Sequence, residues 1–243
     1  RTVGRSRRGG SWSKPRLRLL GAILATVAGT ANADPLIEVG NAGDLPGTAQ
    51  SSAGVAPFGT PLDYISGTVA NDSDQDMFAI YISDPVNFSA TTSNPETTID
   101  DTMLYLFDEN GLGVLANDDT SDSDFRSRLQ PGALSAGQEG VYYIAVSLLF
   151  TSPLSASGDV FDLAELEATT LTIGANGAGS GDPINGWDVF AFTGPGDYRI
   201  DLTGATFIEG PAPNVPSLGP AVGLVLTLLL AACGAMALRR QAA

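Results

Sequence analysis

The sequence contains no histidine and only one cysteine, Cys233. A domain with neither histidine nor paired cysteines has no Cys/His metal centre and no internal disulfide bond. Lysine is absent after Lys14, so general-base chemistry in the rest of the chain would depend on carboxylates. The nucleophile motif Gly-x-Ser-x-Gly is also missing. These absences argue against most hydrolase classes. The enzymatic alternative is a hydrolase with a carboxylate pair, which needs no fixed spacing in the sequence.

Positive charge is scarce in the central part of the chain. All 27 acidic residues lie between Asp34 and Glu209, where the only basic residues are Arg126, Arg128 and Arg199. With three positive and 27 negative side chains, this region carries a net charge of −24. Such a surface repels nucleic acid, which is bound through basic side chains. It attracts divalent cations and basic partners instead.

The other basic residues lie near the two ends, and those at the start belong to an export signal. Residues 1–18 contain seven basic and no acidic residues, and an apolar stretch over 19–28 follows. Ala31 and Ala33 then form an A-x-A site. This order is typical of a secretory signal peptide, so we expect a signal helix within residues 1–33 and cleavage after Ala33.

A second apolar segment, residues 221–238, carries no charge and is followed by the basic tail 239–243. A bilayer core needs about 20 apolar residues, so the sequence predicts one C-terminal transmembrane helix after a Pro-rich linker over 211–220. The positive-inside rule places the tail in the cytoplasm and the acidic region across the membrane. A buried core helix is the alternative, although a helix that is apolar on every face suits a membrane better.

Short segments rich in β-branched and aromatic residues predict an all-β domain over 34–210. Turns rich in Gly, Pro, Asn and Asp separate them, which is typical of an antiparallel β-sandwich. Residues 103–107 and 142–147 are almost continuously apolar, as in strands at the middle of a sandwich. The Ser/Gly/Ala-rich stretch 149–186, with one helical segment over 162–168, predicts an insertion or long loop. The predicted strands cover residues 64–69, 77–82, 87–91, 103–107, 113–117, 141–147, 189–192 and 198–202.

Several motifs of this domain occur in a characteristic order. They are Gly-Asp-Leu-Pro-Gly-Thr from Gly43, Asp-Gln-Asp from Asp74, Leu-Tyr-Leu-Phe-Asp-Glu-Asn-Gly from Leu104, Ala-Asn-Asp-Asp from Ala116 and Gly-Val-Tyr-Tyr-Ile-Ala-Val-Ser from Gly140. Over about residues 44–207 the chain thereby resembles bacterial pre-peptidase C-terminal-like domains, especially those of a group of surface proteins. The resemblance implies a jelly-roll-like, non-catalytic β-sandwich of a kind often appended to secreted hydrolases. It also implies calcium binding in some relatives, mainly through an acidic linker, to which residues 38–44 of this chain do not correspond cleanly.

The C-terminal region resembles the PEP-CTERM class of sorting signals, in particular its IPTL-like variants. The resemblance implies that an exosortase-type membrane enzyme recognises a short motif before the span and removes the tail. This chain departs from the common Pro-Glu-Pro and Ile-Pro-Thr-Leu forms of the motif. The residues that would form the signal are Val215, Pro216, Ser217, Leu218, Gly219 and Pro220, with Arg239 and Arg240 after the span.

Carboxylate and amide oxygens, the ligands that calcium prefers, are concentrated in the predicted turns. The acidic stretch 118–124 lacks the Gly and Glu positions of an EF-hand loop, so any site would have another geometry. The alternative is that these residues cap turns, as the sequence of 108–111 suggests. The candidate calcium ligands are Asp74, Asp76, Asp100, Asp101, Asp108, Asn110, Asp118 and Asp119.

Together these features predict a non-catalytic protein exported through the inner membrane to the cell envelope, the surface or the extracellular matrix. Its expected partners are the membrane before processing, the sorting enzyme and exopolysaccharide, and not nucleic acid. The alternative is an accessory module that binds calcium or polysaccharide for a secreted hydrolase on another chain. Most aromatic residues fall in predicted strands and favour core packing, and Trp187 is the one candidate for a sugar contact.

Overall fold

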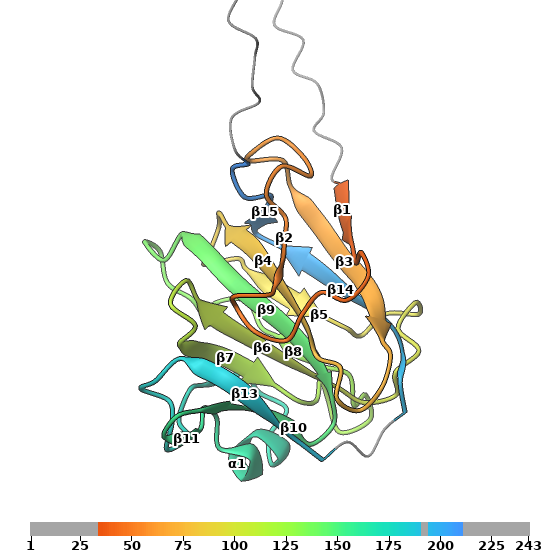
Figure 1. The fold of residues 1–243 in the computed structure, drawn as a ribbon, viewed down its shortest axis with the longest axis vertical. Coiled ribbons are helices and arrows are strands. Elements are labelled where there is room, and N and C mark those ends of the chain that lie inside the picture. The colour runs from red at the N-terminus through yellow and green to blue at the C-terminus, as the bar shows by residue number, and fades with distance from the viewer. Residues whose placement is uncertain (1–33, 191–193, 211–243) are drawn as a thin grey trace, which may run out of the picture. The chain divides into compact units, whose positions relative to one another are not determined.

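The computed structural model describes residues 34–190 and 194–210. The predicted signal segment lies in residues 1–33. The predicted linker with its sorting motif, the membrane span and the basic tail lie in residues 211–243, so all of them are outside the described residues. Within the described part, no helix has both the length and the apolar character needed to cross a membrane. The described residues form three β-sheets and one short helix, α1 (Leu163–Glu167), so the all-β prediction is confirmed (Figure 1).

A five-stranded sheet has the strand order β1-β3-β14-β5-β8. A seven-stranded sheet has the order β12-β7-β6-β9-β4-β15, and β2 pairs with β4 in addition. Neighbouring strands are antiparallel except for the β1–β3 and β2–β4 pairs, which are parallel. The five-stranded sheet comprises β1 (Asp34–Ile37), β3 (Leu62–Val69), β5 (Ser89–Thr91), β8 (Arg128–Leu129) and β14 (Gly196–Thr203). The seven-stranded sheet comprises β2 (Gln50–Ser51), β4 (Asp76–Ile82), β6 (Thr102–Asp108), β7 (Gly113–Asn117), β9 (Gly140–Leu148), β12 (Ile173–Gly174) and β15 (Ala205–Thr206).

These two sheets pack face to face around a shared hydrophobic core, as in a β-sandwich. In β14 the side chains of Tyr198, Ile200 and Leu202 are buried, whereas the residues between them are partly exposed. This alternation follows from the two-residue period of a strand with one face in the core. The arrangement supports the predicted sandwich for the main body of the domain.

The seven-stranded sheet is buried on its other face too, which explains the apolar runs in the sequence. In β6 the alternate residues Met103, Tyr105 and Phe107 form a second core with Phe161 and Leu166, which come from the stretch predicted as an insertion or long loop. This stretch contains strands and a helix and covers the sheet, instead of forming a long irregular loop. It forms a three-stranded sheet in the order β11-β10-β13 together with α1 (Figure 1). The strands are β10 (Thr151–Ser155), β11 (Gly158–Asp159) and β13 (Ile184–Val189), and with α1 they are called the third layer below.

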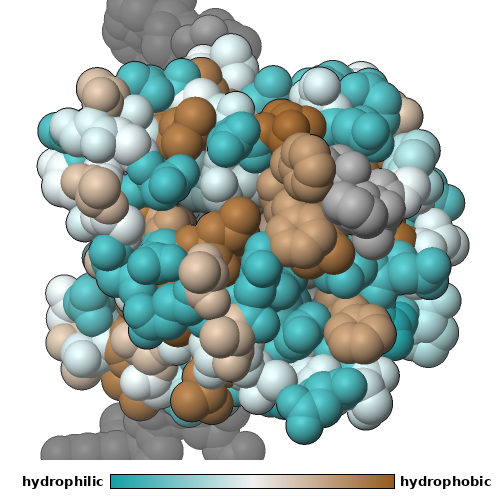
Figure 2. All heavy atoms as spheres, turned by 90° about the horizontal axis from the view of Figure 1, so that it is seen from below, coloured by the Kyte–Doolittle hydropathy of each residue, from teal (hydrophilic) through white to brown (hydrophobic). Residues whose placement is uncertain are grey.

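Trp187 lies in β13 and packs into this second core. Its ring stands edge-on to Tyr105 and Phe107, and its indole N–H donates to the carbonyl of Asp44 over 2.8 Å. The structure thus favours core packing over the sugar contact considered for this residue. Of the strand predicted at 189–192, Val189 is the last residue of β13, Phe190 follows the strand, and residues 191–192 lie outside the described residues. Seen from below the view of Figure 1, hydrophilic residues on this side surround smaller apolar patches (Figure 2).

Candidate metal centre

Three of the predicted calcium ligands, Asp101, Asp118 and Asp119, lie together. One carboxylate oxygen from each is within 4.8 Å of the other two. Asp101 immediately precedes β6, and the other two residues immediately follow β7. β6 and β7 pair antiparallel with Leu104 opposite Asn117, so the start of one strand and the end of the other meet at one edge of the sheet. We call these three residues the acidic cluster.

Asp118 is the buried member of the acidic cluster. Its side chain is 3% exposed, and Oδ1 has no hydrogen-bond partner among the described residues. Burial, with smaller contributions from three neighbouring carboxylates, raises the pKa of Asp118 to about 8. Those neighbours are Asp119, Asp101 and Glu167. A buried carboxylate without a compensating partner is costly to ionise, so this position favours either a proton or a bound cation.

The other two members are partly buried and lie in the same negative field. Burial raises the pKa of Asp101 to about 7, and the charges of Asp119, Asp100 and Glu167 contribute in the same direction. Burial also raises the pKa of Asp119, and the nearby carboxylates of residues 122 and 124 raise it further. Among the described residues, arginine side chains pair with Asp124, Glu96 and Asp201, and none pairs with Asp118 or Asp119. The arginines therefore leave the negative charge of these two residues uncompensated.

The loop after the acidic cluster is held in place by its own hydrogen bonds. The Asn117 side-chain oxygen accepts from the backbone N–H of Arg128 over 2.6 Å, which closes the loop back onto the strand. Asp124 accepts from Ser93 and pairs with Arg126 at 2.9 Å. Although burial acts to raise the pKa of Asp124, these donors outweigh it and the pKa is lowered. The loop thus holds Asp118 and Asp119 against the sheet.

The other predicted ligands lie elsewhere. Asp100 is the exposed neighbour of the acidic cluster. Asp108 is the last residue of β6 and Asn110 lies in the β6–β7 turn, at the far end of the hairpin from the cluster. There the Asp108 Oδ1 accepts from the backbone N–H groups of Asn110 and Leu112 at 2.8 and 2.9 Å. Asp108 therefore stabilises a turn, which is the alternative that the sequence left open.

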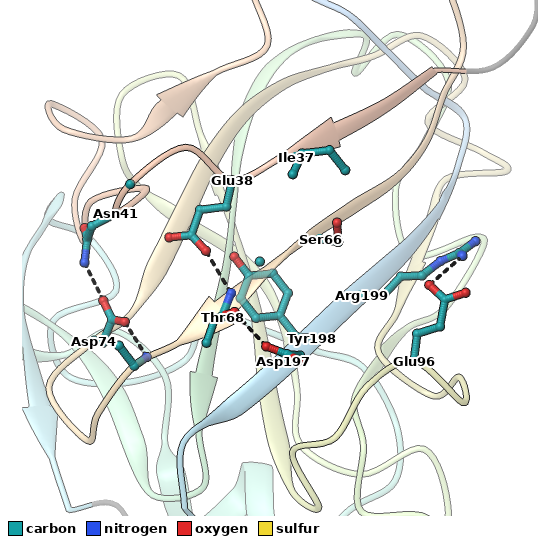
Figure 3. Close-up of a pocket in the computed structure, with 13 residues that line it drawn as sticks. Ile37, Glu38, Asn41, Ser66, Thr68, Asp74, Glu96, Asp197, Tyr198 and Arg199 are labelled. Carbon is teal, nitrogen blue, oxygen red and sulfur yellow. Dashed lines mark hydrogen bonds and ion pairs between the residues drawn. The ribbon is translucent and has the colours of Figure 1, made fainter.

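Asp74 lines a hollow between β1 and the adjoining parts of β3 and β14 (Figure 3), and Asp76 lies near Tyr198, which lines the same hollow. The Asp74 carboxylate accepts from the Asn41 side chain and from the backbone N–H of Ala70, both at 2.6 Å. Glu38 accepts from the backbone N–H of Thr68 at 2.8 Å. The segment 38–44 therefore packs against β3 and Asp74, and several of its oxygens already accept hydrogen bonds from protein donors.

Asp76 is fully buried next to this hollow. Burial raises its pKa to about 7, with Glu38 and Asp74 adding in the same direction. The Tyr198 hydroxyl and the Ala42 amide lie near the carboxylate and lower the pKa, but neither reaches it in the geometry of a hydrogen bond. Burial and the nearby carboxylates also raise the pKa of Tyr198 well above its usual value. The fold therefore shifts the protonation equilibrium of Asp76 toward its neutral form, relative to an exposed aspartate.

One residue beside the acidic cluster was not singled out from the sequence. Glu167 ends α1, and its charge raises the pKa of Asp101 and of Asp118. No local pattern in the sequence links Glu167 to the acidic cluster, whose members precede it by 48 to 66 positions, because only the packing of the third layer brings it near. Comparison with models of protein families finds no match to the chain, and comparison with curated proteins finds none either.

Proposed function

We propose that this chain is a non-catalytic, exported β-sandwich protein that binds a divalent cation, with calcium the best fit, through Asp101, Asp118 and Asp119. The observation that carries the proposal is the buried, unpartnered Oδ1 of Asp118 within a group of three carboxylates. A cation at this position would neutralise the charge that the arginines leave uncompensated. Hydrolases also use carboxylates with raised pKa, but a 3% exposed Asp118 cannot contact a polymeric substrate.

Calcium suits this ligand set better than the other common biological metals. All the ligands are oxygens, which favours hard cations over zinc or copper. Calcium accepts six to eight oxygens in flexible geometry, whereas magnesium demands a near-ideal octahedron and retains water. Three carboxylates, each binding through one or two oxygens, supply part of such a shell, and backbone carbonyls and water can complete it. Extracellular calcium sites often bind with a Kd of about 10⁻⁴–10⁻³ M, and we expect an affinity in this range for an exported protein.

A calcium titration of the full chain tests the cation site. We expect calcium to raise the Tm and to give a saturable binding isotherm by calorimetry, with about 2.7 kcal/mol of stabilisation at one hundred times Kd. Asp118→Asn should abolish the isotherm. Asp63→Asn is the matched control, because it removes one exposed carboxylate from β3 and should bind normally. Equal binding by Asp118→Asn and the wild type would refute the assignment.

The location and the jelly-roll-like family are proposed from the sequence resemblances. The support is the order of signal segment, acidic domain, sorting motif, apolar span and arginine pair, and the family would make the domain a surface or matrix component. Mass spectrometry of the termini in each cell fraction tests this. We expect an N-terminus at Asp34 and loss of the segment after the linker in the surface or medium fraction. An intact terminus beyond Arg240 there would show that the signal is not cleaved. Trp187 is partly buried, packs against the second core and donates to the carbonyl of Asp44, which argues against a sugar-binding role for its ring.

A further inference from the structure

We propose that Glu167 of α1 is a fourth ligand of the cation held by the acidic cluster, so that the cation fastens the third layer to the seven-stranded sheet. This inference rests on the proposed function and extends it. Asp101, Asp118 and Asp119 are carried by the β6–β7 hairpin, whereas Glu167 is carried by the third layer. A cation shared by both would therefore add an ionic link between two layers that already meet through apolar contacts and hydrogen bonds, such as the one from the Tyr105 hydroxyl to the Thr151 carbonyl.

The position of Glu167 is fixed by the short helix that carries it. Asp162 caps α1 by accepting from the backbone N–H groups of Ala164 and Glu165, at 3.0 and 3.2 Å. Leu166 is fully buried in the second core, together with Met103 and the other inward residues of β6. The adjacent residue, Glu167, is consequently held at the side of this core, and with Asp119 and Asp122 it lines an open hollow.

The Glu167 carboxylate acts on the acidic cluster. Glu167 and Asp119 line the same hollow, so α1 places a fourth carboxylate beside the acidic cluster. Without a cation, the third layer thus brings a fourth negative charge against three others, which opposes its packing when all are ionised. When a cation is bound, the negative charge of Glu167 is attracted to it. The open hollow leaves space for the Glu167 side chain to approach the ion.

Hydrogen exchange and calorimetry on the full chain, with and without calcium, test this assignment. In the wild type, calcium should protect amides of 160–176 as well as those of 101–104 and 117–120. Glu167→Gln should bind calcium roughly tenfold more weakly and, at saturating calcium, lose the added protection of 160–176 while keeping that of the hairpin. Glu165→Gln is the matched control, because it removes the same charge two residues away in the same helix and retains an oxygen for Asn176.

The outcomes separate the two proposals. If Glu167→Gln binds calcium with unchanged affinity and shows the same protection of 160–176, Glu167 is not a ligand, while the three-carboxylate site stands. If the wild type gives no isotherm and no protection, the cation site itself is refuted and this inference falls with it. Weaker binding by both Glu167→Gln and Glu165→Gln to the same extent would indicate a general charge effect and would also overturn the role of Glu167.

Discussion

At the scale of single residues, the described part of the chain buries several acidic groups that proteins usually expose. Asp76 and Asp118 are 0% and 3% exposed, respectively, and each has a side-chain oxygen without a hydrogen-bond partner among the described residues. Asp74, by contrast, is buried but accepts two hydrogen bonds. Residue type alone does not distinguish these cases, because all three read as acidic turn residues in the sequence. Their ionisation is therefore a property of the fold.

The raised pKa of Asp76 predicts a stability that falls with pH. Burial raises this pKa to about 7 from 3.8, so the folded state binds the proton more tightly than the unfolded chain does. The contribution of Asp76 to the free energy of unfolding is therefore fully present below about pH 4 and is lost as the pH rises through about 7. Asp76→Asn replaces the carboxylate by a neutral group of the same shape, so at pH 8 this variant should unfold at a higher temperature than the wild type. The expected gain in the free energy of unfolding is a few kcal/mol, because each unit of pKa shift corresponds to about 1.4 kcal/mol.

Thermal unfolding in a chelator at pH 4, 6 and 8 measures this effect without interference from calcium. The difference between Asp76→Asn and the wild type should shrink toward pH 4. Asp63→Asn, which alters an exposed carboxylate, should follow the wild type at every pH. Parallel curves for Asp76→Asn and the wild type would show that the Asp76 carboxylate is not responsible.

At the scale of elements, the sequence predicted the seven-stranded sheet better than the third layer. β7 has the predicted bounds, and β6 differs by one residue at each end, because short apolar runs bounded by turn residues favour buried strands. The strands β10 and β11 are short and polar, and β10 contains Pro153. Their pattern indicates a loop, since their pairing depends on packing against distant residues. For the same reason the sequence yielded the acidic residues of the hairpin but not Glu167.

Removing Phe161 should loosen the third layer selectively. This side chain is fully buried and stacks against Tyr105 and Phe107 in the second core. Phe161→Ala should cost about 3–5 kcal/mol. Hydrogen exchange should rise in 151–189 far more than in β3 and β14, which belong to the first core. Leu171→Ala is the control from the same stretch, because Leu171 is 59% exposed and its loss should change stability by less than about 0.5 kcal/mol. A uniform rise over both cores would show that the layers unfold as one unit.

At the scale of the whole molecule, the charge of the central region frames the role of a cation. Residues 34–209 carry 27 acidic side chains and three arginines, so any cation screens repulsion to some extent. A specific site differs from screening in its pH dependence, because a bound cation competes with protons for the same oxygens. The pKa values of about 7 for Asp101 and about 8 for Asp118 place this competition near neutral pH.

This competition predicts how calcium and pH combine. In a chelator, the stability of the folded chain should fall as the pH rises from about 4 to 8, because the folded carboxylates of Asp101 and Asp118 hold their protons more tightly than the unfolded ones. Calcium binds the deprotonated carboxylates, so its stabilising effect should grow over the same interval. The Tm difference between calcium and chelator should therefore be small at pH 5 and largest at pH 8, and Asp118→Asn should remove most of it. General screening of the acidic surface would give equal shifts with magnesium and calcium in both proteins, and that result would leave the acidic cluster without a specific cation.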